Sequence, residues 1–360
     1  MNFDITDEEL KELALKQNKS IEEVASDYKY ALKDLEYSQK KINSIIESHG
    51  YKKNLSEINL HGYGINGELA SKYCCYDGTK ELFSNACENL ALVTGFGPTN
   101  PPTAGTLSSI FKILEMQRET GIYTHIIISE LSALNSRQKS FNELLNYTHQ
   151  FINFIKKLGF DENNGEIRTH NYLDHARTFS IISSVLKVSD FADGEATDEM
   201  YKRLNLLGND YSTMVSMVYT TADIVLPIIR DKKKGVIVTA GLEEHLYPYL
   251  ARVTIERLKQ KNGGLNNLVE KEAQVGALYG KLISGLFPYV KMSKSIKESS
   301  INLGDSDEEL YDKIFKWVRR DYAQWQYYKE KYYKFFLEIK KMWDKSKNND
   351  LINTYNELFK

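Results

Sequence analysis

The sequence contains few cysteines and lacks long hydrophobic runs. Its three cysteines, Cys74, Cys75 and Cys87, are too few for a disulfide framework, and no C-x-x-C pair is present to begin a zinc site. We therefore expect reduced thiols. No run approaches the roughly 20 apolar residues of a membrane-spanning helix. The first residues, MNFDITDEELKELALKQ, are acidic and have no apolar core typical of a signal peptide. These absences predict a cytoplasmic protein without a membrane partner.

An excess of charge of either sign is also missing. The 47 Lys and Arg residues nearly balance the 49 Asp and Glu residues, and the formal net charge is -2. This balance excludes a generally basic nucleic-acid coat, although it leaves room for a local basic patch. With 360 residues, of which 42% are hydrophobic, the chain is long enough to bury one large core and one smaller core.

Short β-branched runs occupy the middle of the chain. They are ENLALVTGFG, THIIISEL and KGVIVTAGL, and each is bounded by residues that break strands. Amphipathic stretches such as TLSSIFKILEMQRETG lie between them, with apolar residues on one helical face. Strands that alternate with helices predict an α/β fold with a buried parallel sheet.

The two ends of the chain have helical patterns. Over roughly residues 3–50, apolar residues recur at helical spacing among charged ones, and after residue 304 strand character is almost absent. Asp305 or Ser306 is expected to cap a helix that has acidic residues in its first turn. We therefore predict an N-terminal helical extension (1–88), an α/β domain (89–304) and a small C-terminal helical domain (305–360).

A glycine- and proline-rich turn, TGFGPTNPPTAGTLSSI, follows the first buried run. It contains Gly95, Gly97 and Gly105, and a helix is expected to start near Gly105 or Thr106. Glycine lets the backbone approach a ligand closely, and a helix N-terminus attracts phosphate through its unpaired N–H groups. The turn lacks the Gly-Lys-Ser/Thr of a P-loop, so the same residues also fit a simple tight connection between strand and helix.

Two lysines three residues apart mark a second segment suited to polyphosphate, KMSKS, at Lys291–Ser295. This pentapeptide reproduces the signature loop of class I aminoacyl-tRNA synthetases, and the chain resembles the tryptophanyl branch of that family over about residues 90–315. The other signature blocks have counterparts in the family's order: TGFGPTNPPTAGT, IIISELSALNSR, MVYTTADIVLP and GLEEHLYPYLAR. A solvated surface loop is the alternative interpretation of Lys291 and Lys294.

The resemblance implies a Rossmann-like catalytic domain that uses ATP and Mg2+, activates tryptophan as its adenylate and passes it to tRNA, within a homodimer. It implies catalytic roles for Lys291, Lys294, Thr103 and Thr106. It assigns the nucleotide to Gly95, Gly97, Thr103, Gly105, Thr106, Gly241, Glu243, Met292, Ser293 and Ser295. It assigns the amino acid to Asp223 and Glu244. No dedicated metal ligands are visible, and the seven histidines are scattered, so we expect them to be surface or hydrogen-bonded residues rather than ligands.

Asp223 also stands out without the resemblance. A carboxylate within the apolar run VYTTADIVLP is costly to bury unless a partner compensates it. A helix-surface position or a capping contact is one solution. The resemblance implies another, a selector that accepts the indole N–H of tryptophan and rejects phenylalanine, which would leave the buried acceptor unpaired.

Several positions depart from the family pattern. Thr103 and Thr106 stand where histidines are usual, Glu243 stands where Asp is usual, and Glu244 stands where Gln is usual. Hydroxyl groups still donate hydrogen bonds to phosphate. Two adjacent carboxylates, by contrast, favour the ammonium group of an amino acid and repel the phosphate of an adenylate.

The C-terminal tail is shorter than the family's helical anticodon-binding domain and mixes aromatic with basic residues. Such a stripe binds RNA by phosphate contact and base stacking, or it forms the packed face of a helical hairpin. The short tail and the two glutamates leave two other functions open. One is a paralogue that supplies an activated amino acid or aminoacyl-tRNA to a small-molecule or peptide pathway. The other is a non-catalytic regulatory protein that binds nucleotide.

Overall fold

The computed structural model divides the chain into two compact units. Unit 1 contains residues 1–50, 100–108 and 282–342, and unit 2 contains residues 51–99, 109–281 and 343–360. The structure describes residues 6–25, 43–53, 55, 58–60, 63–64, 67–79, 81–83, 89–137, 140–170, 172–192, 211–261, 264–281, 283, 285–286, 292, 297–316 and 325–347.

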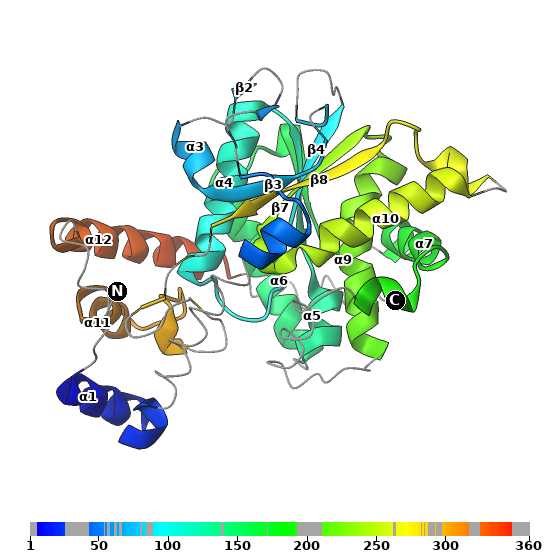
Figure 1. The fold of residues 1–360 in the computed structure, drawn as a ribbon. Helices are drawn as coiled ribbons and strands as arrows, with labels where there is room; N and C mark the ends of the chain where they lie inside the picture. The colour runs from blue at the N-terminus through cyan, green and yellow to red at the C-terminus, as the bar shows by residue number, and fades with distance from the viewer. Residues whose placement is uncertain are drawn as a thin grey trace. The chain divides into compact units, whose positions relative to one another are not determined.

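A six-stranded sheet forms the centre of unit 2 (Figure 1). Its strand order is β3-β8-β7-β4-β5-β6, and β3 alone among these strands runs antiparallel to its neighbour. The strands are β3 (Tyr73–Asp77), β4 (Leu90–Phe96), β5 (Tyr123–Ile128), β6 (Gly165–Arg168), β7 (Gly235–Gly241) and β8 (Gln274–Gly280). The predicted α/β fold is therefore confirmed, and the predicted parallel sheet is parallel in all its pairs except β3 with β8.

The central strands are apolar on both faces. Leu92 of β4, Ile126 of β5 and Ile237 of β7 are each 0% exposed. Aliphatic and β-branched side chains suit a pleated surface that is covered on both sides, as parallel sheets usually are. Leu92 lies opposite Thr124 of β5 on one side and opposite Ile237 on the other. The three predicted runs thus became the three innermost positions of the parallel part of the sheet.

The chain changes its direction of travel across the sheet after β6. It goes from β4 to β5 and β6 on one side, and then returns to place β7 and β8 on the other side of β4. Right-handed crossovers in opposite directions put their helices on opposite faces, as Figure 1 shows for α4 (Ala104–Thr120) and α10 (Leu246–Gln260). Open α/β sheets bind ligands beyond the carboxyl ends of the strands at such a reversal. The carboxyl edge beside β4 is therefore the place in unit 2 where a ligand is expected.

Further helices and turns complete unit 2. They are α3 (Gly67–Ser71), α5 (Glu130–Arg137), α6 (Phe141–Lys157), α7 (Tyr172–Ser183) and α9 (Tyr211–Arg230), the 3-10 turns η2 (Glu162–Asn164), η3 (Val188–Ala192), η4 (Leu242–Glu244) and η5 (Leu265–Leu268), and the pair β1 (Asn59–Leu60) and β2 (Tyr63–Gly64). Ser140 begins α6 with a capping box, in which its hydroxyl accepts the N–H of Glu143 and the Glu143 carboxylate accepts the N–H of Ser140. Within the described ranges, no helix combines the length and the apolar character that crossing a membrane requires.

Unit 1 contains α1 (Asp7–Gln17), η6 (Lys297–Ser299), α11 (Asp307–Lys316) and most of α12 (Trp325–Asp344). Ser306 is the cap of α11, because its hydroxyl accepts the N–H of Glu309 and the Glu309 carboxylate accepts the N–H of Ser306. The sequence left Asp305 and Ser306 as alternatives for this cap. Asp305 is instead buried, with 1% of its surface exposed.

The aromatic residues of the tail are partly packed. The ring of Tyr333 in α12 lies 5.5 Å from that of Tyr311 and 5.8 Å from that of Phe315 in α11, measured between centroids. Tyr328 and Tyr332 stay 39% and 43% exposed. A packed aromatic face is therefore present between α11 and α12, and the RNA-binding alternative remains a prediction.

Strand β3 departs from the prediction that the chain before residue 89 is helical. The sequence YCCYD pairs antiparallel with β8, with Tyr73 opposite Gly280 and Asp77 opposite Ala277. This strand depends on a partner that is distant in the sequence, and local periodicity does not reveal such a partner. The domain boundaries at residues 88 and 304 remain a prediction, and the compact units instead place residues 100–108 together with 282–342.

Candidate active site

The turn of the first signature lies beside a segment that follows KMSKS in the sequence, and both belong to unit 1. Backbone N–H to O=C hydrogen bonds of 2.8 and 3.0 Å join residues 102–104 to residues 301–303. Thr103 and Asn302 form an antiparallel β-bridge in the middle of this contact. The turn that leads into α4 is therefore paired with the chain segment that begins six residues after Ser295.

Thr103 and Thr106 form the first turn of α4 and are 4% and 6% exposed. The Thr103 hydroxyl oxygen accepts the N–H of Thr106 (3.3 Å), and the Thr103 carbonyl oxygen accepts the N–H of Leu107 (2.8 Å). The two threonine hydroxyl oxygens lie 3.3 Å apart, so one hydroxyl proton bridges them. Within the described ranges no acceptor takes the second hydroxyl proton, which can donate to a ligand, whereas the N–H groups of Ala104, Thr106 and Leu107 already have acceptors.

The packing of the chain does not explain the glycines of the first signature. A Cβ atom added at Gly95, Gly97 or Gly105 would meet its nearest heavy atom at 3.5, 3.9 or 3.6 Å, which are ordinary van der Waals distances. None of the three has a positive φ angle. Neither crowding by described atoms nor a positive φ angle requires glycine here, so close approach of a ligand to the backbone remains as an explanation for these glycines.

Most of the KMSKS segment falls outside the described residues. Lys291, Ser293, Lys294 and Ser295 belong to that group, and their assigned roles remain predictions. Met292 is described, and its N–H donates to the carbonyl oxygen of Ile283 (3.3 Å).

Gly241 ends β7, and Glu244 folds back onto it. The Glu244 carboxylate accepts the N–H of Gly241 (3.3 Å) across the turn η4. The side chain of Glu243 lies outside the described atoms. One oxygen of Glu244 is thus engaged by the backbone, and its contact with the amino acid stays a prediction.

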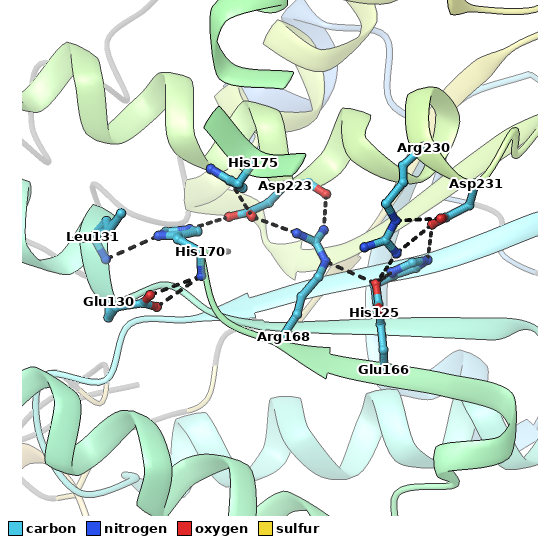
Figure 2. A network of polar contacts seen from close by, with 10 residues as sticks. All are labelled: His125, Glu130, Leu131, Glu166, Arg168, His170, His175, Asp223, Arg230 and Asp231. Carbon is cyan, nitrogen blue, oxygen red and sulfur yellow. Dashed lines mark hydrogen bonds and ion pairs between the residues drawn. The ribbon is translucent and has the colours of Figure 1, made fainter. Parts of the chain in front are cut away.

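Unit 2 holds a buried polar network centred on Asp223 of α9 (Figure 2), and Asp223 is 4% exposed. Its Oδ1 accepts hydrogen bonds from His175 Nε2 (3.0 Å) and Arg168 Nη1 (3.3 Å). Its Oδ2 accepts a hydrogen bond from His170 Nε2 (3.1 Å). Arg168 Nη2 also donates to the Asp223 carbonyl oxygen (2.8 Å). The compensation that a carboxylate needs in an apolar run is therefore supplied by three side chains.

These partners keep Asp223 ionised. Burial raises the pKa of the carboxyl group, but the two histidines facing it, His170 and His175, outweigh burial and hold that pKa well below its usual range. Each carboxylate oxygen accepts about two hydrogen bonds. Among the described residues Oδ1 has two donors and Oδ2 has one, which leaves Oδ2 one acceptor position for a further N–H or O–H group.

The ring of His170 is held at both nitrogens. Its Nδ1 accepts the N–H of Leu131 (3.2 Å), while its own backbone N–H donates to Glu130 (3.1 Å). Burial lowers the pKa of His170, and the charge of Asp223 raises it by more. The Leu131 contact nevertheless needs the lone pair of Nδ1, so the ring is neutral and carries its proton on Nε2, directed at Asp223. Tyr219 stacks on this ring at 5.3 Å between centroids.

Arg168 connects Asp223 to a second cluster at the start of β5 and β6. Its Nε lies 3.5 Å from Glu166 Oε1, which also contacts His125 Nδ1 (2.8 Å) and the guanidinium of Arg230. His125 is 0% exposed, and burial lowers its pKa. Burial raises the pKa of Glu166, but hydrogen bonds from His125 and Arg230 lower it by more, to about 2. A continuous series of ion pairs and hydrogen bonds therefore leads from Asp223 through Arg168 to Glu166, and from there to His125 and Arg230.

Two sets of side chains in this network have ligand atoms within 4.8 Å of one another, as in a metal site. They are His170, His175 and Asp223, and His125, Glu166 and Asp231. In the first set the Nε2 of His170 carries a proton and has no lone pair for a metal ion. In the second set Arg230 already pairs with both carboxylates. The arrangement favours hydrogen-bonded ion networks over metal centres at both places.

Sequence reasoning singled out Asp223 and missed its partners. The general expectation that histidines are surface or hydrogen-bonded residues fits His170 and His175, but it did not place them around Asp223. An available signal was the run GEIRTHNYLDH. It puts Arg168 and His170 at the carboxyl end of a strand, but GEIR is too short and too polar to be recognised as β6 without its neighbour β5.

The acidic branch of the stability curve should depend on Glu166. Its pKa in the folded state is about 2, below its ordinary value of 4.5, so the unfolded chain binds more protons between these values. Its stabilising contribution is present above about pH 4.5 and is lost as the pH falls toward 2. We expect Glu166→Gln to lower the free energy of unfolding at pH 7 by about 1–3 kcal/mol and to flatten its decline in acid. Urea titrations from pH 7 to pH 3 measure this. Glu162→Gln, which alters an exposed ion pair with Lys156, is the control, and an equal effect in both variants would contradict the assignment.

The fold of this chain is similar to the folds of known tRNA synthetases, and its sequence matches a family model. The family model described as tRNA synthetases class I (W and Y) matches residues 85–360. A similar solved structure is the tryptophanyl-tRNA synthetase of the archaeon Aeropyrum pernix, with TM-score 0.68 and 16% identity over 86% of this chain and 94% of that chain. A tryptophanyl-tRNA synthetase from Encephalitozoon cuniculi bound to tryptophan has TM-score 0.61 and 17% identity over 85% and 96%. The tyrosyl-tRNA synthetase of Archaeoglobus fulgidus complexed with L-tyrosine has TM-score 0.52 and 17% identity over 66% and 68%. No curated protein sequence matches this chain.

Proposed function

The chain belongs to the class I tRNA synthetases (W and Y), and we propose on that basis that it activates tryptophan with ATP and transfers it to tRNA. The observation that carries the proposal is the pairing of residues 102–104 with residues 301–303. This pairing joins the turn before α4 to the segment that follows KMSKS, within one compact unit. This contact supports a common site for the threonine turn and for the KMSKS segment that precedes residues 301–303 in the sequence.

Unit 1 supplies the groups for the ATP phosphates. Lys291 and Lys294 bring positive charge, and one hydroxyl proton of the Thr103–Thr106 pair bridges the two oxygens while the other is available to donate. In the reaction an oxygen of the amino acid's carboxylate attacks the α-phosphorus, the bond to the bridging oxygen breaks, and pyrophosphate leaves with that electron pair. Such a step depends on positioning and on charge stabilisation, so it needs no nucleophile from the protein.

Magnesium fits this set of groups as a companion of ATP. The first signature offers hydroxyls and the second offers ammonium groups, and both kinds of group bind phosphate oxygens. The ion is then held by phosphate oxygens and water, as is usual for Mg2+ at nucleotide sites. When bound, it neutralises charge on the phosphates.

Three glycines stand at the carboxyl ends of neighbouring strands. Gly95 and Gly97 lie at the end of β4, where packing alone does not require glycine, and Gly241 ends β7 beside it. This is the edge at which open α/β sheets bind ligands. We assign these three positions to the nucleotide.

Tryptophan is favoured by the remaining acceptor position on Asp223 Oδ2. An indole N–H satisfies that position, whereas phenylalanine offers no donor and leaves it unpaired, which a buried site penalises. A solved structure similar to this chain contains tryptophan, and another contains tyrosine, whose O–H is also a donor. Tyrosine is therefore the competitor that the assay must include.

The second step of the proposed reaction passes the aminoacyl group to tRNA. A hydroxyl of the terminal adenosine attacks the adenylate carbonyl, the mixed anhydride bond breaks, and AMP leaves. We also propose that the protein is a homodimer, as its resemblance to the family implies. The exposed Tyr328 and Tyr332 of α12 are candidates for stacking on RNA bases.

The test is amino-acid-dependent exchange of pyrophosphate into ATP across all twenty amino acids, followed by charging of total tRNA. We expect exchange with tryptophan and charging of its tRNA. Exchange without charging of any tRNA would contradict the transfer step and favour an acceptor in a small-molecule or peptide pathway. Absence of exchange with every amino acid, with tRNA present, would contradict enzymatic activation itself.

A further inference from the structure

Lys313 of α11 is a buried lysine whose donors are all used. It is 6% exposed, and its Nζ donates to Asp305 Oδ1 (2.9 Å), to Asp305 Oδ2 (2.8 Å) and to the carbonyl oxygen of Lys297 (3.0 Å). An ammonium group has three protons, so these contacts exhaust it. Lys313 therefore holds two points of the chain, one at residue 297 and one at residue 305.

Asp305 connects Lys313 to Asn302, which contacts the first signature. Its Oδ2 accepts the N–H of Asn302 (2.8 Å), and its own N–H donates to the carbonyl oxygen of Asn302 (3.0 Å). Asn302 is the residue that forms the β-bridge with Thr103. The next turn is also tight, because a Cβ at Gly304 would lie 3.0 Å from Cγ of Pro101. The ion pair thus fixes the residue that contacts the threonine signature.

The segment between the two fixed points is itself buried. Ser299, Ser300, Ile301 and Leu303 are between 0% and 4% exposed. Its N-terminal end, residue 297, is two residues from Ser295, the last residue of KMSKS.

We propose that the Asp305–Lys313 ion pair is a positioning element of the ATP site. It sets the segment 297–305 against Thr103, which the proposed function places at the ATP phosphates. The proposal rests on the proposed function, and it adds two residues that touch no substrate and act through their neighbours. Phosphoryl transfer depends on positioning, and displacements of about 1 Å can cost roughly 100-fold in rate.

The experiment compares wild type with Lys313→Met and with the double variant Asp305→Asn, Lys313→Met. The single variant leaves the Asp305 carboxylate buried without its cation and is expected to unfold at a lower temperature. The double variant removes both charges while keeping shape, and the amide oxygen that it introduces at position 305 still accepts the N–H of Asn302. The double variant therefore distinguishes a loss of activity caused by unfolding from a loss caused by mispositioned ATP-site residues. Lys340→Met is the matched control, because it removes an ion pair with Asp307 of the same helix α11 that lies outside residues 297–305.

For each folded variant, kcat and the KM values for ATP and for the amino acid are measured by pyrophosphate exchange. We expect the double variant to lose about 100-fold in kcat/KM for ATP while the KM for the amino acid changes less than about twofold. Lys340→Met should match wild type. A double variant with wild-type kcat/KM for ATP overturns the positioning role and leaves the proposed function standing. No exchange in wild type overturns both.

Discussion

Lys294→Ala should reduce adenylate formation by about 100- to 1000-fold, as loss of one group that stabilises transition-state charge does. By resemblance its ammonium group faces the pyrophosphate that gains negative charge as the α-phosphorus is attacked. An interaction that strengthens in the transition state appears in kcat rather than in amino-acid binding. The measurement is single-turnover formation of the adenylate under saturating ATP, together with pyrophosphate exchange.

Lys156→Ala is the control for this substitution. Lys156 is a partly exposed lysine of α6 whose ion pair is with Glu162. Its loss should leave exchange unchanged and cost at most about 1 kcal/mol of stability. If Lys294→Ala retained the wild-type rate with a wild-type melting temperature, the KMSKS segment would be a surface loop and the assignment of Lys294 would be wrong.

Asp223→Asn should lower the free energy of unfolding by about 3–5 kcal/mol, because it leaves buried cationic and polar partners without their carboxylate. Arg168 is 9% exposed, and its guanidinium has both Asp223 and Glu166 as counter-ions. Chemical denaturation at pH 7 measures the loss. The control is Asp344→Asn, whose ion pair with Lys347 is exposed and is expected to contribute at most about 1 kcal/mol. Equal losses in the two variants would contradict the role of the network.

The same variant tests the choice of amino acid. With an amide at position 223, an NH2 group replaces one of the two carboxylate oxygens. This group donates hydrogen bonds and does not accept them, so the acceptor for an indole N–H is lost. We expect the ratio of kcat/KM for tryptophan to that for phenylalanine to fall by at least about tenfold, within the range that a lost buried acceptor accounts for. An unchanged ratio in folded protein would show that Asp223 is structural and that another group reads the side chain.

The fold was predictable from the sequence because its central strands carry their own signal. LALV, III and VIV are apolar on both faces, so they are buried in any arrangement that keeps the helices around them. The short edge elements lack such a signal. GEIR and YCCYD become β6 and β3 only through hydrogen bonding to β5 and β8. A strand of this kind is stabilised by its neighbour and not by its own composition.

For the candidate site, the sequence determined which groups are available: the signature glycines and threonines, the two KMSKS lysines, and one carboxylate in an apolar run that needs compensation. The tertiary structure alone decided which groups meet. It brought Arg168, His170 and His175 to Asp223, and it made Asp305 the partner of Lys313 while Ser306 became the helix cap. The physical reason is that burial makes an ion costly in every fold, whereas its partner is chosen by contacts between elements that are distant in the sequence.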